Sequence, residues 1–560
     1  MRSTAASSQD PTPAGVSSGV VFLVGAGPGD PGLLTLRGAE LLARADVVVY
    51  DGLVNPALMD HVRASAERVY AGKKRPPGGQ ALTQGEINRV LCEHARAGKR
   101  VVRLKGGDPL VFGRGAEECR ELRNAGIRFE IVPGITAATG VTAYAGIPLT
   151  ARNVASTVVF ATGHEAAGKP SSDIDWEALA RAGTVVLYMA WRTVADCCQR
   201  LMAAGRSAET PACAVYWGTT AAQKTVTSTL GELPGTIASA GLKPPVLVVV
   251  GEVVSMRSQL AWHEMRPLAG ARVLVTRNVE QSRAFTGAIT ELGGEPVLMP
   301  VTRIAPAGDA DRAVLDQVVA QLGAYDWILF TSANSVDRFF AELHARARDT
   351  RALGRALVAC VGPATARAAR AHGVVADVVP RHGNAEKLAG AVIAARKSPG
   401  GRAMQPADAD STSTRGRILL PRAAQGRDEA QIALRAAGFE VDVATVYHTE
   451  MVRSDDPTIR HGLSRLRAGD IDVMAFFAPS QVRALFDLLG PAAVEIVGSC
   501  RHVAAIGNTT KAALNRRGVD VHVVPSRPDA VVMAEELATF YHETQRAGRS
   551  DRARSNSEKA

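Results

Sequence analysis

The residues best suited to chemistry lie in the stretch 101–115, VVRLKGGDPLVFGRG, where an apolar strand pattern runs into a charged, glycine-rich loop. The first residues predict a buried strand, and Gly106, Gly107 and Pro109 end that strand and leave backbone amides free to contact a ligand. Open α/β sheets bind ligands at such loops, at the carboxyl ends of their strands. An ordinary strand-to-helix turn remains the alternative, because short glycine motifs also occur where nothing binds.

The element that must position this loop is an α/β sheet, which begins near the N-terminus. Residues 20–51 follow the order strand, glycine loop, helix and strand, which predicts a parallel sheet. Gly25 and Gly27 match the spacing of a dinucleotide-binding loop, and Asp51 ends the second strand where a ribose-binding acid would lie. However, Asp30 replaces the third glycine and puts negative charge where a pyrophosphate would bind. Dinucleotide binding is therefore the weaker interpretation.

Length and charge limit the classes of function. A chain of 560 residues is too long for one hydrophobic core and predicts about three or four domains. The chain carries 65 Lys and Arg against 55 Asp and Glu, and this net charge of +10 favours either an acidic partner or only a well-solvated surface. Aromatic residues make up 5% of the chain, and neither zinc-finger spacing nor an RNA-binding aromatic motif is found. These features count against nucleic acid as the partner, and an acidic small molecule fits the charge equally well.

The cysteines and the N-terminal residues predict a cytoplasmic location. None of the 7 cysteines forms a CxxC pair, and most lie in apolar or helical context, as reduced thiols do. Residues 1–18 lack the apolar core of a signal peptide and are expected to form a disordered tail. Because no apolar run approaches the roughly 18 residues of a membrane span, no membrane partner is expected.

The second half of the chain contains a repeat. After residue 262 the glycine-loop pattern stops, and a new domain begins with the strand RVLVTR. The segment VGPATARAARAHGVVADVVP from Val361 matches IGNTTKAALNRRGVDVHVVP from Ile506, and YDWILFTSANSV matches IDVMAFFAPSQV. Two similar α/β lobes are predicted. The polar residues 397–417 and the basic residues 542–560 are expected to be disordered.

Six ordered motifs of the N-terminal half resemble those of a known family. GAGPGDPGLLTLRG, ADVVVYD, RLKGGDPLVFGRG, VPGITAATGVTAYAGIPLT, TGH and LYM are similar to motifs of uroporphyrinogen-III C-methyltransferase, in the tetrapyrrole methylase superfamily. The resemblance covers about residues 19–262 and implies a fold of two α/β subdomains, S-adenosylmethionine as methyl donor, no metal, and a homodimer formed through this half. One departure lies at Thr150, Ala151 and Arg152, where the family usually has Thr-His-Arg.

The same resemblance implies site residues for methyl transfer. It assigns Asp51 as proton acceptor and Lys73 as proton donor, since methylation of a pyrrole carbon requires a proton to leave the macrocycle. Without the surrounding motifs, either side chain would be interpreted as ordinary surface charge. The resemblance implies cofactor contacts from Pro28, Gly106, Gly107, Asp108, Val111, Thr136, Ala137, Met189 and Gly218.

The C-terminal half resembles uroporphyrinogen-III synthase. The resemblance depends on VLVTRNVEQSRAFTGAITELGGEPVLMPV, FTSAN, VGPAT, ILLPRAAQGRDEAQIALRAAGFEVDVATVYHT and IGNTT, and it covers about residues 268–541, after a linker at 263–267. It implies a two-lobed α/β fold without a cofactor, with lobe one at 268–304 plus 446–541 and lobe two at 305–445.

This resemblance implies that hydroxymethylbilane, a linear tetrapyrrole rich in carboxylates, binds between the lobes. Tyr447 is expected near the departing hydroxyl group. Helix capping is the alternative role for each serine and threonine, although a helix N-terminus that caps itself can also bind a carboxylate. FFAPS replaces the family's FTSPS in the second repeat, so Phe477 and Ala478 supply no hydroxyl donors. The expected carboxylate donors are Arg277, Ser332, Asn334, Thr365, Ser480 and Thr510.

Together the two resemblances predict a bifunctional enzyme of tetrapyrrole biosynthesis. The C-terminal half would cyclise hydroxymethylbilane to uroporphyrinogen III with inversion of ring D, and the N-terminal half would methylate that product twice to precorrin-2. Two alternatives remain: a methylase that acts later on the corrin ring beside a degenerate synthase, and a sensor that only binds S-adenosylmethionine or tetrapyrrole. The sequence leaves open whether the product goes to sirohaem or to cobalamin.

Overall fold

The computed structural model describes residues 19–63, 65–72, 82–163, 173–380, 384–397, 416–426 and 428–557. Lys73, the expected tail at 1–18 and nearly all of the expected insertion at 397–417 lie outside these ranges. The described residues divide into two compact units. One contains the chain up to Val273 with 285–296 and the residues from Ala534 onward, and the other contains Leu274–Ala284 and 297–533. Within the described ranges, no helix combines the length and apolar character needed to cross a membrane.

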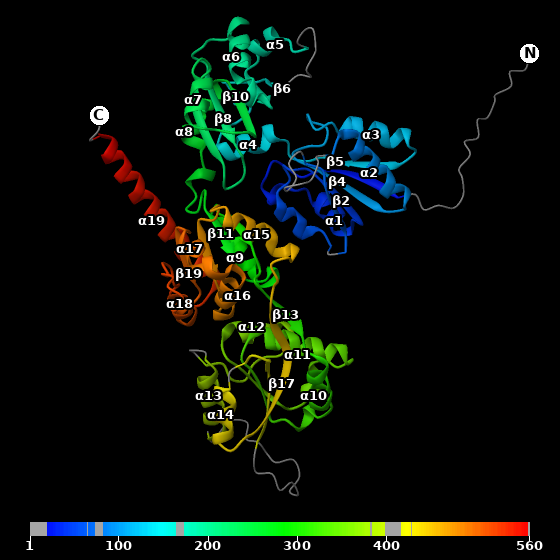
Figure 1. Cartoon of the computed structure of the whole chain (residues 1–560), viewed down its shortest axis with the longest axis vertical. Coiled ribbons are helices and arrows are strands. Elements are labelled where there is room, and N and C mark those ends of the chain that lie inside the picture. Colours follow the sequence, from blue (N-terminus) through cyan, green and yellow to red (C-terminus); the bar gives the residue numbers. More distant parts are fainter. Residues whose placement is uncertain are drawn as a thin grey trace, which may run out of the picture. The chain divides into compact units, whose positions relative to one another are not determined.

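The first sheet is parallel, as the pattern of residues 20–51 predicts. Its elements are β1 (Val20–Gly25), η1 (Pro31–Leu33), α1 (Leu36–Arg44), β2 (Val47–Tyr50), η2 (Pro56–His61), β3 (Glu67–Tyr70), α2 (Gln84–Arg96), β4 (Arg100–Lys105), α3 (Gly115–Asn124) and β5 (Arg128–Val132). The strand order is β3-β2-β4-β1-β5, and every neighbouring pair is parallel. Phe22 and Val24 pack with α1, whereas Val21 and Leu23 pack with α2 and α3, so helices cover both faces (Figure 1). Strand β3, a short edge strand whose first two residues are exposed, was not predicted from the sequence.

The second sheet is mixed. Its elements and the preceding helix are α4 (Ala137–Ala145), β6 (Val158–Thr162), α5 (Trp176–Arg181), β7 (Thr184–Tyr188), η3 (Ala190–Arg192), α6 (Val194–Ala203), β8 (Pro211–Tyr216), β9 (Lys224–Thr229), α7 (Leu233–Ser239), β10 (Val246–Val250), η4 (Glu252–Met256), α8 (Arg257–Leu260) and η5 (His263–Met265). The order is β6-β7-β10-β8-β9; β6 is parallel to β7, and β10 is antiparallel to β7 and β8. Ala138 and Val141 of α4 pack on this sheet, so α4 connects the two subdomains.

Five strands form the sheet of lobe two. Its elements are β13 (Thr302–Pro306), α10 (Asp309–Ala320), η6 (Leu322–Ala324), β14 (Trp327–Phe330), α11 (Ala333–Ala345), η7 (Thr350–Leu353), β15 (Leu357–Cys360), α12 (Pro363–Ala371), α13 (Ala385–Lys397), β16 (Arg417–Ala423), α14 (Glu429–Ala436) and β17 (Glu440–Met451). The order is β13-β17-β16-β14-β15. The expected lobe boundaries after residues 304 and 445 fall inside β13 and β17, which pair in antiparallel register. These two paired strands therefore carry the chain between the lobes.

The sheet of lobe one confirms the predicted repeat. Its elements are β11 (Arg272–Val275), α9 (Val279–Glu291), β12 (Glu295–Leu298), α15 (Pro457–Arg467), β18 (Val473–Phe476), α16 (Pro479–Leu489), η8 (Gly490–Ala492), α17 (Ala493–Gly498), β19 (His502–Ala505) and α18 (Asn508–Asn515). The order is β12-β11-β18-β19. The parallel pair β18–β19 corresponds to β14–β15 in lobe two. Each copy adds one isolated bridge at the equivalent place, Ala359 with Val378 and Ala504 with Val523.

The last helix differs from the expected disordered tail at 542–560. Helix α19 (Ala530–Ser557) continues through most of those residues. Met533, Leu537 and Tyr541 are buried at the four-residue spacing of one helix face, which anchors the first half of α19. The following residues include strong helix formers such as Gln, Arg and Ala, so the helix can extend past its buried face.

Candidate active sites

Three loops at the carboxyl edge of the first sheet interlock through glycines. The N–H of Gly107 donates to the carbonyl of Gly27 at 2.7 Å, and the N–H of Gly27 donates to the carbonyl of Gly107 at 3.2 Å. A Cβ atom on Gly134 would lie 2.3 Å from the oxygen of Gly107 and 2.7 Å from the Cα of Gly25. At Gly25 and Gly134 the backbone segments therefore approach too closely for any side chain, whereas Gly27 and Gly107 have positive φ, +74° and +69°, which favours glycine.

The carboxylate of Asp108 holds the second loop to the third. Its Oδ1 accepts hydrogen bonds from the N–H groups of Leu110 at 2.8 Å and Val111 at 3.2 Å, and its Oδ2 accepts from the N–H of Gly134 at 3.0 Å. Both carboxylate oxygens of Asp108 thus bind backbone N–H groups of the loops. Asp108 and Val111 therefore belong to the interlocked loops that would form the expected cofactor site.

The N-terminus of α4 fits a polar ligand. Thr136 precedes α4 but makes no side-chain cap, because its Oγ1 lies 2.6 Å from the hydroxyl of Tyr188, which also accepts from the N–H of Ala138 at 2.8 Å. Burial raises the pKa of Tyr188, which keeps this hydroxyl protonated. Gly107 has φ +69°, and a Cβ there would lie 3.9 Å from the backbone nitrogen of Ala137. Helix N–H donors beside a glycine loop suit the oxygen atoms of a nucleoside or amino-acid group.

The remaining expected cofactor residues gather around the same helix. A Cβ on Gly140 of α4 would lie 2.5 Å from Cγ of Pro28, and a Cβ on Gly218 would lie 2.4 Å from a methyl group of Val141. Met189 follows Tyr188, has φ +56° and is 52% exposed. Segments far apart in the sequence therefore bring the predicted residues to one region.

Asp30 has a structural role in the first loop. Its Oδ1 accepts from the N–H of Gly32 at 2.7 Å, its Oδ2 accepts from the hydroxyl of Tyr144 at 2.7 Å, and its own N–H donates to Oγ1 of Thr219 at 2.9 Å. Burial together with the Asp30 carboxylate raises the pKa of Tyr144. An acid used in this way explains why the loop departs from the dinucleotide-binding pattern.

Asp51 lies directly after β2 and is paired with Arg103, which was not among the predicted site residues. Oδ1 of Asp51 is 2.7 Å from Nη2 of Arg103, and the Asp51 side chain is 29% exposed. Arg103 in turn contacts Glu118 at 3.2 Å. The sequence did contain a signal for this network, because Arg103 and Lys105 interrupt an otherwise apolar strand.

In the synthase half, Arg277 occupies a position that suits an anion. Its guanidinium lies 5.4 Å from the centre of the Phe477 ring, and its Nε donates to Oε1 of Gln281 at 3.0 Å. Gln281 also donates to Oδ1 of Asn334 in lobe two, so this contact joins the lobes. Burial lowers the pKa of Arg277, and within the described part of the chain no carboxylate forms an ion pair with it. A half-buried cation of this kind favours a carboxylate ligand.

Ser332, two residues before Asn334, meets Tyr447. Oγ of Ser332 lies 3.4 Å from the hydroxyl of Tyr447, which is buried at 6% exposure. The same Oγ accepts from the N–H of Ser335 at 3.0 Å and caps α11. Ser332 therefore caps a helix, which was the alternative role considered for it, and it also lies within reach of Tyr447, which was not predicted.

The other expected carboxylate donors are placed differently. Thr365 and Thr510 are each 3% exposed, in the first turns of α12 and α18. Ser480 is exposed on α16. Within the described residues, no hydrogen bond connects any of these three hydroxyls to Arg277, Ser332 or Tyr447. The structure thus brings Arg277, Ser332, Asn334 and Tyr447 together and leaves these three apart.

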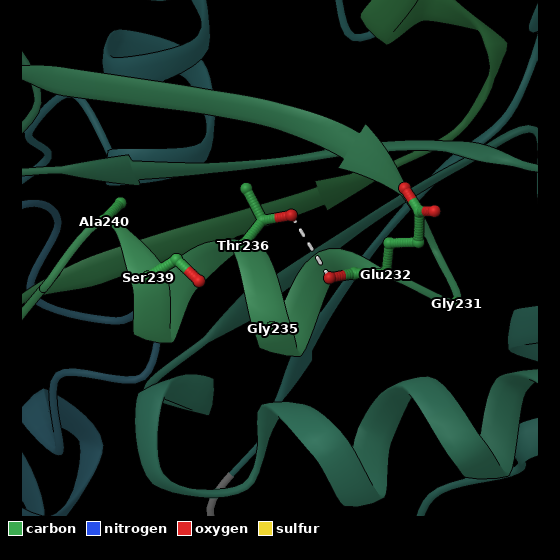
Figure 2. Close-up of a pocket in the computed structure, with 6 residues that line it drawn as sticks. All are labelled: Gly231, Glu232, Gly235, Thr236, Ser239 and Ala240. Atoms are coloured by element: carbon green, nitrogen blue, oxygen red, sulfur yellow. Dashed lines mark hydrogen bonds between the residues drawn. The ribbon is translucent and has the colours of Figure 1, made fainter. Parts of the chain in front are cut away.

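An open hollow beside α7 contains none of the predicted residues. Figure 2 shows its lining, in which the hydroxyl of Thr236 donates to the carbonyl of Glu232 at 3.2 Å. The remaining residues of the lining are Gly231, Gly235, Ser239 and Ala240. The hollow has no cation and no carboxylate pair, so we assign it no part in either site.

Two family models match the chain: Tetrapyrrole (Corrin/Porphyrin) Methylases at residues 20–234 and Uroporphyrinogen-III synthase HemD at residues 283–535. The porphyrin biosynthesis protein HemD of Ruminiclostridium josui is 32% identical over 498 residues, which cover 89% of this chain and 94% of that protein. The siroheme synthase of Chromobacterium violaceum is 55% identical over 247 residues, 44% of this chain and 52% of that protein, so the chain spans about half the length of this relative. The solved structure of uroporphyrin-III C-methyl transferase from Thermus thermophilus complexed with S-adenyl homocysteine is 38% identical, has a TM-score of 0.36, and matches over 42% of this chain and 93% of that chain.

Proposed function

The chain belongs to the HemD family of porphyrin biosynthesis proteins and carries a tetrapyrrole methylase domain followed by a uroporphyrinogen-III synthase domain, and on this premise we propose that it catalyses two successive reactions. The C-terminal half cyclises hydroxymethylbilane to uroporphyrinogen III. The N-terminal half methylates uroporphyrinogen III twice and releases precorrin-2. The order of the two reactions gives a reason for the fusion, because the product of one half is the substrate of the other.

The observation that carries the methylase proposal is the meeting of the glycine loops and α4 beside Asp51. Leu53, two residues after Asp51, approaches the second loop so closely that a Cβ on Gly106 would lie 3.1 Å from the Cβ of Leu53. S-adenosylmethionine, when bound, supplies a methyl group activated on a sulfonium. The chain would hold it with the loop and α4 residues expected above, and Asp51 would accept the proton that leaves the methylated carbon. Lys73, the proposed proton donor, lies outside the described residues.

The synthase proposal is supported by the cluster of Arg277, Ser332, Asn334 and Tyr447, to which both lobes contribute. Tyr447 would donate its proton to the departing hydroxyl of hydroxymethylbilane, with Ser332 at 3.4 Å to orient the phenol. Arg277 would bind a substrate carboxylate, because it is a half-buried cation without a carboxylate partner in the described part of the chain. The cyclisation passes through a reactive cation, so its outcome depends on the shape of the site more than on a strong catalyst. Asn334, Thr365, Ser480 and Thr510 remain proposed contacts of the other carboxylates.

We also propose a location, an oligomeric state and a class of partners for the enzyme. We infer a cytoplasmic homodimer formed through the methylase half, with small tetrapyrroles as partners and with no nucleic acid or membrane. The synthase half would need no cofactor, and neither half would need a metal. Sedimentation velocity of the full chain would test the dimer. We expect a dimer at micromolar concentration, with no dissociation to monomers.

The proposed reactions can be tested together on the full chain. Purified protein is supplied with hydroxymethylbilane under anaerobic conditions, with and without S-adenosylmethionine, and the macrocycle isomer and its methyl count are measured by chromatography and mass spectrometry. We expect the type III isomer without the methyl donor and a dimethylated type III product with it. The type I isomer alone, which forms without an enzyme, would disprove the synthase activity.

Two variants separate the halves in the same assay. Asp51→Asn should reduce the rate of methyl transfer, without affecting cofactor binding, while the type III isomer still forms. Tyr447→Phe should slow formation of the type III isomer while supplied uroporphyrinogen III is still methylated. Failure of the unmodified chain to methylate supplied uroporphyrinogen III would disprove the methylase activity, and a single methyl group would restrict it to one transfer.

A further inference from the structure

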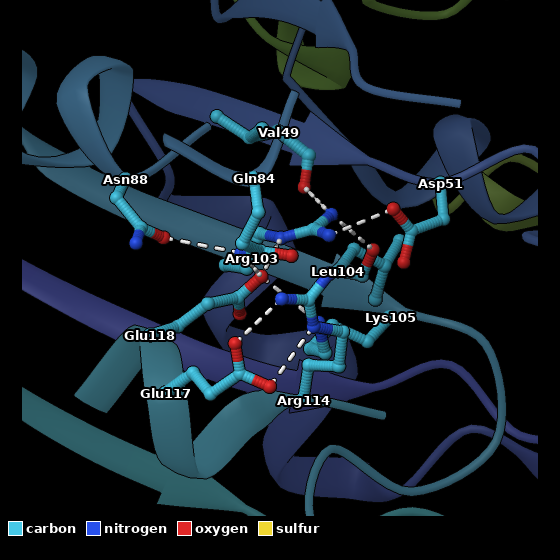
Figure 3. Close-up of polar contacts among 10 residues, drawn as sticks. All are labelled: Val49, Asp51, Gln84, Asn88, Arg103, Leu104, Lys105, Arg114, Glu117 and Glu118. Atoms are coloured by element: carbon cyan, nitrogen blue, oxygen red, sulfur yellow. Dashed lines mark hydrogen bonds and ion pairs between the residues drawn. The ribbon is translucent and has the colours of Figure 1, made fainter. Parts of the chain in front are cut away.

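Asp51 and three buried charged side chains, Arg103, Lys105 and Glu118, form one network (Figure 3). Arg103 and Lys105 lie on the same face of β4, Glu118 comes from α3, and Asp51 follows β2. Arg103 is 2% exposed, Lys105 is 3% exposed, and Glu118 is fully buried. Arg, Lys and Glu are almost never buried to this degree unless they are paired.

The contacts of this network fix the Arg103 guanidinium on several sides. Its Nε donates to Oε1 of Glu118 at 3.2 Å, and its Nη2 donates to Oδ1 of Asp51 at 2.7 Å. Its Nη1 lies 3.4 Å from the carbonyl oxygens of Val49 and Leu104. A guanidinium with a fixed fork of donors holds its partners in one orientation, which a lysine cannot reproduce.

Glu118 binds the side chains of both buried cations, Arg103 and Lys105. Its Oε1 also accepts from Nζ of Lys105 at 3.0 Å and from Nε2 of Gln84 at 3.1 Å, whereas its buried Oε2 has no hydrogen-bond partner among the residues that the structure describes. Burial, and then the neighbouring Arg103 cation, lower the pKa of Lys105. Two cations and two carboxylates balance, so each buried charge has a partner of opposite sign.

A contribution to the free energy of unfolding does not by itself explain why these charges are buried. Replacing a buried ion network by apolar residues of similar volume is often neutral or stabilising, because desolvation of the charges offsets their attraction. The member of the network that reaches solvent is Asp51, with 29% of its side chain exposed. Arg103 engages Oδ1 of Asp51, and within the described residues Oδ2 makes no hydrogen bond. The network therefore orients a carboxylate whose second oxygen stays open.

We propose that Arg103 is a positioning residue for methyl transfer, which sets the direction of the Asp51 carboxylate, and that Glu118 keeps Arg103 in place. The inference depends on the proposed methylase function, since it gives Asp51 a proton to accept. Arg103 acts through Asp51 and contacts no substrate atom. Small errors in the placement of a reacting group cost much in rate, and side chains locked by a supporting shell prevent them.

The test compares Arg103→Lys, Asp51→Asn and the double variant in the full chain, with uroporphyrinogen III and S-adenosylmethionine. We expect Arg103→Lys to lower kcat by about tenfold or more and to leave KM for S-adenosylmethionine within about twofold. The double variant should be no slower than Asp51→Asn alone, because Arg103 has nothing left to position. Arg100→Lys, an exposed arginine on the same strand that pairs with Asp46, is the matched control and should keep kcat.

Several results would overturn the inference. They are an unchanged kcat in Arg103→Lys, a loss that adds fully to that of Asp51→Asn, and a higher KM with unchanged kcat. A crystal structure of Arg103→Lys supplies a readout that needs no turnover: an Asp51 side chain in its original rotamer would reject positioning. If the unmodified chain does not methylate uroporphyrinogen III, the proposed function fails, and the rotamer still decides the positioning role.

Discussion

Asp108 accepts a hydrogen bond from the backbone N–H of Gly134 at 3.0 Å, and this contact ties two loops that belong to different strand ends. The other carboxylate oxygen accepts from two N–H groups of the Asp108 loop itself. All of these contacts lie inside the loop framework, so Asp108 would support cofactor binding by keeping the framework closed.

Asp108→Asn should weaken binding of S-adenosylhomocysteine by about tenfold or more. The amide nitrogen of asparagine cannot accept a hydrogen bond, so one backbone N–H loses a charged acceptor, at a cost of about 1.5–3 kcal/mol. Isothermal titration calorimetry on the full chain measures the change. Glu40→Gln, an exposed surface variant, is the control and should bind normally. An affinity within twofold of the original in Asp108→Asn would contradict this role.

Gly134→Ala should abolish binding of S-adenosylhomocysteine. Its Cβ would lie 2.3 Å from a backbone oxygen and 2.7 Å from a Cα atom, and neither can move without opening the loops. Gly85→Ala is the matched control, because a Cβ there meets no atom of the described residues within 4 Å. We expect Gly85→Ala to bind the ligand normally and to be slightly more stable, since alanine favours helix. Equal binding by both alanine variants would show that the loops are not tightly interlocked.

Patterns that are local in the sequence predicted the framework well. The order of strand, glycine loop and helix over residues 20–51 gave the parallel sheet, and the matching segments from Val361 and Ile506 gave the two lobes, whose equivalent bridges confirm the repeat. The edge strand β3 was missed, because a short strand with exposed residues carries little periodic pattern. The mixed order of the second sheet was missed as well, because strand direction depends on pairing between segments far apart in the sequence.

The contacts that build the sites depend on residues far apart in the sequence. Tyr188 meets Thr136 across 52 residues, and Arg103 meets Asp51 across 52 residues, so no local spacing indicates either pair. The replacement of the family's threonine by Phe477 suggested only a lost donor. The structure shows that its ring lies against Arg277, a contact between the ends of β11 and β18 that pattern analysis cannot supply.

His263 should make the first unit less stable in acid. It is 4% exposed, and burial, followed by the Arg266 cation, lowers its pKa to about 4. Between about pH 6.5 and pH 4 the unfolded chain therefore binds more protons than the folded one, so the free energy of unfolding falls as the pH falls through this window. From pH 7.5 to pH 5 the loss is on the order of 2 kcal/mol for this group.

His263→Phe should remove that part of the pH dependence. Phenylalanine keeps an aromatic ring beside Trp262 and Tyr144 but does not titrate. Hydrogen–deuterium exchange of peptides that contain Trp262, measured at pH 5 and pH 7.5 after correction for intrinsic exchange, reports the local free energy. His61→Gln changes an exposed histidine and should retain the original dependence. A dependence in His263→Phe as steep as the original would refute the assignment.

Phe477→Leu should raise KM for hydroxymethylbilane by about fivefold, because the aromatic ring under the Arg277 guanidinium would be lost. The ring centre lies 5.4 Å from the guanidinium carbon, and such a contact contributes about 0.5–2 kcal/mol. The effect should fall mainly on KM, since Arg277 would bind a carboxylate alike in substrate and transition state. Phe477→Tyr keeps the ring and should retain the original KM, whereas Phe477→Thr, which restores the family's residue, should behave as Phe477→Leu does. Steady-state assays with separation of the type I and type III isomers measure all three variants. If Phe477→Leu and Phe477→Tyr give the same KM, the aromatic ring does not help Arg277 to bind substrate. The FFAPS motif has then lost the family's hydroxyl donors and gained no contact in their place.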